Sequence, residues 1–332
     1  MAMTLKMLED FFSRMIKILL LFFLLDSSCN AGNQVTLKVF HAGSLSVPFQ
    51  KIETLFEKKY PWIDVKRESS GSVMAVRKVI DIQKPCDVIA VADYSLIPKM
   101  MFPKYADHVK LFARNELVLC YTEKSKYHKI INEKNWYKIL CKKGVKWGFS
   151  DPNLDPCGYR TVMCVLLSDL YYKVPVFKML FEKYLPSFRI IKKEAFVAEI
   201  PTSFSPMRKK IFIRPKSVQL IGLLESGVID YAVEYLSVAK QHHLNFLRLP
   251  SEINLGSLRL KTYYRKVAVV LGNTKKIHAK PIVYGIAYLK TSSHPKEAKL
   301  FERFVTGKLG VRALKESYQT PIYPAEVINA NE

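Results

Sequence analysis

The chain has 332 residues, of which 49% are hydrophobic, with 13 glycines and 17 prolines, a composition typical of a folded globular protein rather than a disordered one. Its 52 basic residues outnumber 29 acidic ones, which gives a formal net charge of +23. This charge fits nucleic acid, an anionic membrane surface or an anionic solute as partner. The sequence has no RGG tract, zinc finger or basic helix to favour nucleic acid, and no CxxC pair to indicate a zinc or redox site.

The N-terminal segment indicates export. Three basic residues precede or open an apolar run over residues 16–25, which is far shorter than the roughly 20 residues a membrane-spanning helix needs. Its length is that of a signal-peptide core, and cleavage is possible after Ala31. A lipid on Cys29 is an alternative, although Asp26 is unusual in a lipoprotein signal; an uncleaved N-terminal anchor is another. We therefore expect residues 1–31 to be a signal peptide or lipoprotein signal, and the rest to work outside the cytoplasmic membrane.

The following segments alternate between strand and helix patterns. Residues 35–43 alternate as a strand and end in glycine, and residues 46–60 carry apolar side chains at helical spacing. A second strand (63–71), a second helix (72–81) and a buried strand (86–93) follow. Repeated strand-turn-helix units predict an α/β fold with parallel sheets and helices on both faces. The remaining length of about 300 residues suits two domains.

Four strand-to-helix junctions carry a small or hydroxyl residue where a helix begins: Ser44, Ser72, Cys157 and Ser217. Free backbone N–H groups and the positive end of the helix dipole make such junctions suitable for anions. Serine hydroxyls add donors without adding charge. The alternative is that these residues only cap their helices.

Two carboxylates lie close to these junctions in the sequence. Alternation places Ile229, Tyr231, Val233 and Tyr235 on one face of a strand and Glu234 on the other, at the strand's end, where α/β sheets place ligands. Asp155 lies in the turn before the helix of Cys157. A carboxylate beside an anion is repulsive unless its oxygen coordinates an electron-poor centre, as tungsten and molybdenum oxyanions allow and sulfate and phosphate do not. The alternative is a salt bridge for Glu234 and a turn or cap role for Asp155.

The sequence favours a binding protein over an enzyme. It has no nucleophile–base pair and no phosphate-binding P-loop, because Gly307-Lys308 lacks the partner glycine. His41 precedes Ala-Gly-Ser at a strand end, which indicates a packed histidine rather than a catalytic one. We expect no cofactor.

Several stretches resemble one family. VFHAGSLSVPFQKIETLFEKKYPWIDVKRESSGSV, CDVIAVADYSLIPKMMFPKYAD, FARNELVLCYT, SDPNLDPCGYR, RPKSVQLIGLLESGVIDYAVEYLSVAKQH and PIVYGIAYLK are similar, in this order, to the archaeal tungstate/molybdate-binding proteins of the WtpA/ModA type. The resemblance covers nearly all of the chain after the signal, and the DPCGYR and ESGVIDYAVEY motifs are its most specific parts.

The resemblance implies a ligand site. Ser44 and Ser72 would donate to the oxyanion from the first lobe, and the backbone N–H groups of Cys157 and Ser217, with the hydroxyl of Tyr235, from the second. The two carboxylates that complete a six-coordinate metal in the archaeal branch fall on Asp155 and Glu234. Asp151 is the competing choice for the first carboxylate.

The resemblance also implies an architecture and partners. We expect a periplasmic-binding-protein fold of the second type, with two lobes and a ligand cleft between them. The first lobe would comprise 32–119 and 265–332, and the second 120–264, with an irregular loop or hairpin over 192–214. The protein would be a monomer that captures tungstate or molybdate and delivers it to the membrane permease of an ABC importer, which has a separate ATPase subunit. The alternative ligand is another oxyanion, such as sulfate, thiosulfate or phosphate.

Overall fold

The computed structural model describes residues 34–192, 196–207, 209–272 and 276–330. The expected signal segment, with Cys29 and Ala31, lies outside the described residues. No helix within these ranges has the length and apolar character needed to cross a membrane.

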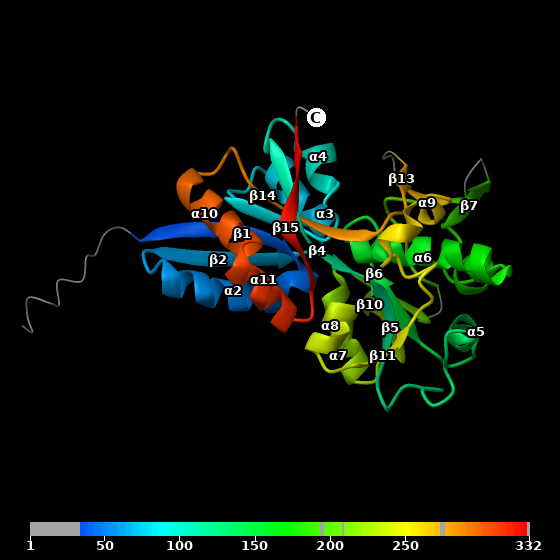
Figure 1. The fold of residues 1–332 in the computed structure, drawn as a ribbon. Coiled ribbons are helices and arrows are strands. Elements are labelled where there is room, and N and C mark those ends of the chain that lie inside the picture. Colours follow the sequence, from blue (N-terminus) through cyan, green and yellow to red (C-terminus); the bar gives the residue numbers. More distant parts are fainter. Residues whose placement is uncertain (1–33, 193–195, 208, 273–275, 331–332) are drawn as a thin grey trace, which may run out of the picture.

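A six-stranded sheet forms the core of the first lobe (Figure 1). Its strands, in spatial order, are β15 (Thr320–Asn329), β4 (His108–Asn115), β14 (Ile282–Tyr288), β3 (Val88–Val91), β1 (Val35–Ala42) and β2 (Ile63–Ser70). Helices α2 (Ser46–Lys59), α10 (Pro295–Thr306) and α11 (Lys308–Glu316) cover one face, and α3 (Ser72–Ile80) and α4 (Leu96–Met100) lie on the other. Their apolar faces close the core, as where Phe49 and Phe56 pack on Phe301.

The second lobe contains two smaller sheets. The five-stranded sheet has the order β11 (Asn245–Arg248), β5 (Leu117–Tyr121), β10 (Tyr231–Tyr235), β6 (Trp147–Ser150) and β9 (Ile211–Arg214). The four-stranded sheet has the order β13 (Ile277–His278), β12 (Val267–Leu271), β8 (Phe196–Ile200) and β7 (Arg189–Lys192). Helix α6 (Pro156–Tyr172) packs against both sheets.

Shorter helices complete the second lobe. They are α5 (Trp136–Cys141), α7 (Leu220–Glu225), α8 (Leu236–Gln241), α9 (Lys261–Tyr264), the π-helical turn η2 (Lys178–Glu182) and the 3-10 turns η3 (Ser217–Gln219) and η4 (Leu258–Leu260). A further 3-10 turn, η1 (Gly43–Leu45), follows β1 in the first lobe.

The expected elements form as predicted, but the sheets are mixed. Strands β1, β2 and β3 are parallel neighbours, whereas β14 runs antiparallel to β3 and β4, and β15 antiparallel to β4. The predicted parallel pairing is therefore present in part of each sheet, beside antiparallel pairs. The reason is that β4, β14 and β15 are not joined to their neighbours by the strand-helix-strand crossovers that make strands parallel.

The chain passes between the lobes twice. It leaves the first sheet at the end of β4 and enters the second lobe at β5, with Glu116 alone between them. It returns between β13 and β14, at residues 279–281. The limits expected from the sequence were 120 and 264; however, β12, which follows residue 264, pairs in parallel with β8 of the second lobe. The expected irregular stretch 192–214 holds the β7–β8 hairpin and β9.

Candidate functional site

The first-lobe side of the site lies at the ends of two parallel strands. Ala42 at the end of β1 is beside Ser70 at the end of β2, so the residues that follow emerge at the same sheet edge. Ser44 lies in η1 and Ser72 opens α3, and both are buried. The Ser44 hydroxyl is 2.9 Å from the hydroxyl of Tyr284, and the Ser72 hydroxyl accepts a 2.9 Å hydrogen bond from a backbone N–H, that of Ala92.

The second-lobe side has the same construction. Strands β6, β9 and β10 are parallel, and their carboxyl ends lead to Cys157 in the first turn of α6, to Ser217 at the start of η3 and to Tyr235 at the end of β10. All three residues are buried. The hydroxyl of Tyr235 accepts a hydrogen bond of 2.7 Å from the guanidinium of Arg160.

The two sides meet face to face. The N–H of Met74 in α3 donates to the carbonyl of Leu154 in the second lobe at 3.2 Å. A Cβ added to Gly71 would lie 2.4 Å from that same carbonyl oxygen, so only glycine permits this approach. The turn η1 touches η3, where a Cβ on Gly43 would lie 3.1 Å from the side chain of Val218. The junctions predicted to hold an anion are thus brought together across the cleft in a closed arrangement.

Asp155 lies where two of the predicted backbone donors converge. Its Oδ1 accepts from the N–H of Cys157 at 3.3 Å, which caps α6, and its Oδ2 accepts from the N–H of Ser217 at 2.9 Å. The cap role expected as an alternative is therefore real. It is only part of the arrangement, because the second oxygen reaches a different junction.

Glu234 is fully buried at the end of β10. Its Oε2 accepts from the N–H of Tyr235 at 2.9 Å, whereas Oε1 has no hydrogen-bond partner among the described residues. The alternative expectation of a salt bridge to lysine or arginine finds no support in the described part of the chain, where no such pair involves this side chain. A buried carboxylate oxygen without a partner is costly in a folded protein.

Burial dominates the protonation of both carboxylates. It raises the pKa of Glu234 to about 8; the N–H of Tyr235 and the side chain of Ser217 oppose this rise, and the nearby charge of Asp155 adds to it. Burial also raises the pKa of Asp155, against the hydrogen bonds from Ser217, Ser150 and Cys157. The two groups are thus close enough to repel each other when both are ionised.

Asp151 differs from Asp155. Its side chain accepts from the N–H of Asn153 at 2.8 Å within its own turn and is only partly buried. Gly158 explains how closely this turn packs on α6, because a Cβ there would lie 2.1 Å from the carbonyl oxygen of Ser150.

Arg160 and Tyr284 take part in the site, although the sequence analysis gave neither a role. The buried guanidinium of Arg160 donates to the carbonyl of Ala92 at 2.8 Å as well as to Tyr235, and so bridges the lobes. Tyr284 holds Ser44 and also accepts from Asn115 at 3.1 Å. The sequence did contain a signal for each: Arg160 lies among apolar residues of a helix, and Tyr284 lies among apolar residues of a strand.

Asp93 lies behind Arg160 and ties both lobes together. It accepts from the hydroxyl of Tyr159 in α6 at 2.7 Å and pairs with Lys280 of the return crossing at 2.8 Å. Arg160 is 3.8 Å away. The positive charges of Lys280 and Arg160 outweigh burial and hold the pKa of Asp93 below its ordinary value.

The predicted site residues are all buried. An open cavity of about 460 Å³ near the crossings is lined by residues such as Tyr94, Arg114, Lys280 and Tyr323, and by none of the predicted site residues. Because Ser44, Ser72 and their counterparts across the cleft are buried, an anion could reach them only if the lobes separate.

Comparisons with known sequences place the chain in a family of extracellular solute-binding proteins. The model of the bacterial extracellular solute-binding protein family matches residues 37–318. The chain is 46% identical, over 86% of its length and 84% of the relative's, to the molybdate/tungstate-binding protein WtpA of Pyrococcus abyssi. It is 45% identical to WtpA of Thermococcus kodakarensis, over 90% of this chain and 86% of that one.

Solved structures share the fold at low sequence identity. The periplasmic molybdate-binding protein of Azotobacter vinelandii superposes with a TM-score of 0.58 at 16% identity, over 86% of this chain and 98% of that one. The sulfate-binding protein SubI of Mycobacterium tuberculosis superposes with a TM-score of 0.56 at 11% identity, over 87% and 88% of the two chains. These likenesses establish the two-lobed binding-protein fold.

Proposed function

The chain belongs to the bacterial extracellular solute-binding protein family, and we propose that it captures molybdate and tungstate outside the cytoplasmic membrane for an ABC importer. The relatives that carry the name molybdate/tungstate-binding protein match this chain at 45–46% identity over most of its length. The observation that carries the proposal is the pair of buried carboxylates, Asp155 and Glu234, at the point where the donor junctions of both lobes meet.

The donors suit a tetrahedral oxyanion. Ser44 and Ser72 would contribute from the first lobe, and the N–H groups of Cys157 and Ser217 with the hydroxyl of Tyr235 from the second. These groups are neutral, so the anion is held by directed hydrogen bonds in a site closed to water, where such bonds are strong. Arg160, behind Tyr235, polarises that hydroxyl toward the ligand.

The carboxylates select the central atom. An oxygen of Asp155 and one of Glu234 would coordinate molybdenum or tungsten, which accept extra ligands, and complete a six-coordinate centre. The unpartnered Oε1 of Glu234 fits this role, because coordination would supply the partner it lacks. Asp155 fits better than Asp151, whose side chain serves its own turn. Sulfate and phosphate offer no such coordination and would meet two carboxylates as repulsive neighbours.

Closure follows from the division of the site. Each lobe carries some of the donors, two on the first and three on the second, so an anion that bridges them stabilises the closed form relative to the open one. The hinge is proposed at Glu116 and at residues 279–281, where the chain changes lobes. The closed protein would act as a monomer, dock on a membrane permease with its ATPase subunit, and perform no catalysis or cofactor chemistry of its own.

Titration calorimetry of the chain from Gly32 onward with tungstate, molybdate and sulfate tests the proposal. We expect tight one-to-one binding of the first two and little or none of sulfate. Equal binding of sulfate would reduce both carboxylates to structural roles and make the protein a general oxyanion receptor.

A further inference from the structure

One segment of the second lobe concentrates positive charge. Residues 123–146, here called the lysine platform, contain eight lysines and two glutamates, a net +6 of the protein's +23. All eight lysines are exposed: Lys124, Lys126, Lys129, Lys134, Lys138, Lys142, Lys143 and Lys146. This charge density requires an explanation apart from the oxyanion site, which uses none of these lysines.

The platform lies on the far side of the second lobe from the cleft. Strands β6 and β10 begin next to the platform and end at the ligand side, with Ser150 and Tyr235. Helix α5, within the platform, lies on the outer side of the lobe (Figure 1). A surface there could contact a partner while the cleft remains free.

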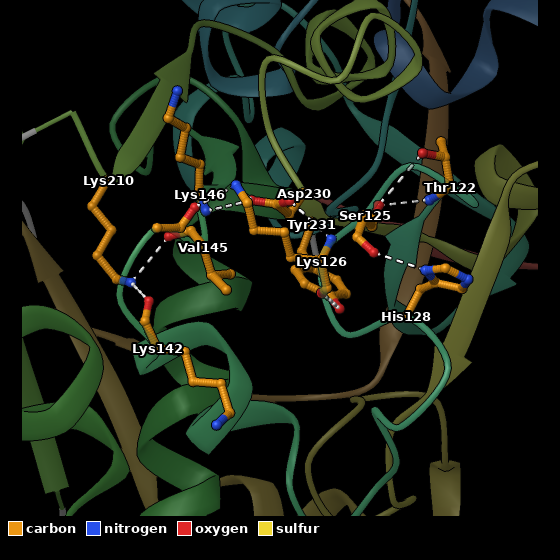
Figure 2. Close-up of polar contacts among 11 residues, drawn as sticks. Thr122, Ser125, Lys126, His128, Lys142, Val145, Lys146, Lys210, Asp230 and Tyr231 are labelled. Carbon is orange, nitrogen blue, oxygen red and sulfur yellow. Dashed lines mark hydrogen bonds and ion pairs between the residues drawn. The ribbon is translucent and has the colours of Figure 1, made fainter.

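A single buried carboxylate fixes both ends of the platform. Asp230 accepts from the N–H of Lys126 at 2.9 Å and from the N–H of Lys146 at 2.7 Å (Figure 2). The ammonium of Lys210 donates to the carbonyls of Lys142 and Val145 at 2.8 and 3.0 Å. These hydrogen bonds anchor the backbone of the platform near Lys126 and between Lys142 and Lys146. The lysine side chains therefore extend from a segment whose two ends are fixed to the rest of the lobe.

The charges of the platform are largely uncompensated. Among the described residues, only Lys126 of the eight lysines lies within ion-pair distance of a carboxylate, that of Asp230, at 3.8 Å. In the first lobe, by contrast, Lys78 and Lys84 both pair with Glu68. The platform therefore presents a positive field to the outside.

Apolar side chains are exposed among the lysines. Ile130 is 56% exposed and Tyr127 40%, and Val228, two residues before Asp230, is 41% exposed. The ammonium of Lys142 is 4.9 Å from the centre of the Tyr127 ring. Lysines interspersed with aliphatic and aromatic side chains are typical of surfaces that lie in the headgroup region of a bilayer.

We propose that the lysine platform binds the anionic headgroups of membrane phospholipids. The lysines would be attracted to the lipid phosphates, and Tyr127 and Ile130 would enter the interface between headgroups and acyl chains. Contact through the platform would hold the protein at the membrane with its cleft unobstructed. A nucleic acid is less suited, because the exposed apolar groups include one aromatic ring and the segment offers no row of stacking side chains.

The test is sedimentation of the protein with vesicles of phosphatidylcholine and phosphatidylglycerol in a two-to-one ratio, and with vesicles of phosphatidylcholine alone. The test variant is K129Q/K134Q/K138Q/K143Q, four exposed lysines without ion pairs. The matched control, K58Q/K296Q/K299Q/K308Q, removes the same charge from exposed positions of the first lobe. Tungstate titration of each variant checks that the fold is intact.

We expect the parent and the control to bind the anionic vesicles in a salt-sensitive manner. Each lysine near such a surface strengthens binding about fivefold, so the platform variant should bind at least about tenfold more weakly. Equal weakening of platform and control variants would overturn the proposal, because the effect would then come from net charge alone. Binding to short duplex DNA but not to vesicles would also overturn it, as would equal binding to uncharged vesicles.

Discussion

The N–H of Ser217 donates a 2.9 Å hydrogen bond to the carboxylate of Asp155. The donor belongs to one of the junctions assigned to the oxyanion, and the acceptor is one of the two carboxylates assigned to its metal. Without the anion, Asp155 thus satisfies a donor that the anion would use. In the proposed site, binding would exchange the internal acceptor for an external one, so the N–H of Ser217 would have an acceptor in both states.

Replacing Asp155 with asparagine should weaken tungstate binding by a factor of about 100 or more. The amide oxygen still caps α6, so the helix is retained, but the negative charge that donates to the metal is gone. The matched variant is D151N, whose carboxylate serves only its own turn. Calorimetric titration of both variants compares them; a larger loss in D151N would mean that the wrong aspartate has been assigned.

Replacing Glu234 with glutamine should stabilise the protein when no oxyanion is bound, and increasingly so at higher pH. The folded-state pKa of Glu234 is raised from 4.5 to about 8, so the folded form holds a proton that the unfolded form releases between these values. The parent therefore loses stability as pH rises from about 4.5 to 8, and E234Q does not. The gain should reach the order of 4 kcal/mol at pH 8. Urea unfolding at pH 5 and pH 8 measures it, and a gain that is the same at both pH values would refute the assignment.

Tungstate binding should release a proton at pH 7 through Glu234. Coordination requires the ionised carboxylate, whereas a group with a pKa of about 8 is mostly protonated at that pH. Titration in buffers of different ionisation enthalpy counts the protons: release by the parent should approach one at pH 7 and vanish above pH 9. The E234Q variant, which has no proton to lose at this position, serves as the control. Release that persists in E234Q would have to come from another group.

Gly71 should be essential for closure. An alanine there would place its Cβ 2.4 Å from the carbonyl oxygen of Leu154 in the opposite lobe. The backbone of Gly71, with φ −61° and ψ 143°, accepts alanine without strain, so G71A should fold and keep the lobes apart. Affinity for tungstate and molybdate should fall by the same factor, and small-angle scattering should show a larger radius of gyration with ligand present. G222A, where a Cβ meets nothing within 4 Å, is the control.

The sequence predicted the local elements and the junctions well, because each follows from short-range patterns. The alternating pattern around Glu234 indicated where β10 ends. The Asp-Pro pair at residues 155–156 indicated where α6 begins. Strand pairing was less predictable, because periodicity identifies a strand and not its partner. Thus the membership of β12 in the sheet of β8 was missed, and with it the position of the return crossing. Arg160 was missed since its role depends on Ala92 and Tyr235, which are distant in sequence.

The coordination of the bound metal tests the central claim most directly. X-ray absorption spectroscopy at a tungsten or molybdenum edge, on the protein loaded with one equivalent of oxyanion, reports the number and distances of the oxygen neighbours. We expect six oxygens, with two at longer distances contributed by Asp155 and Glu234, and four in the variant that carries both D155N and E234Q. A four-oxygen tetrahedral spectrum for the parent protein, identical to that of the free anion, would contradict the account.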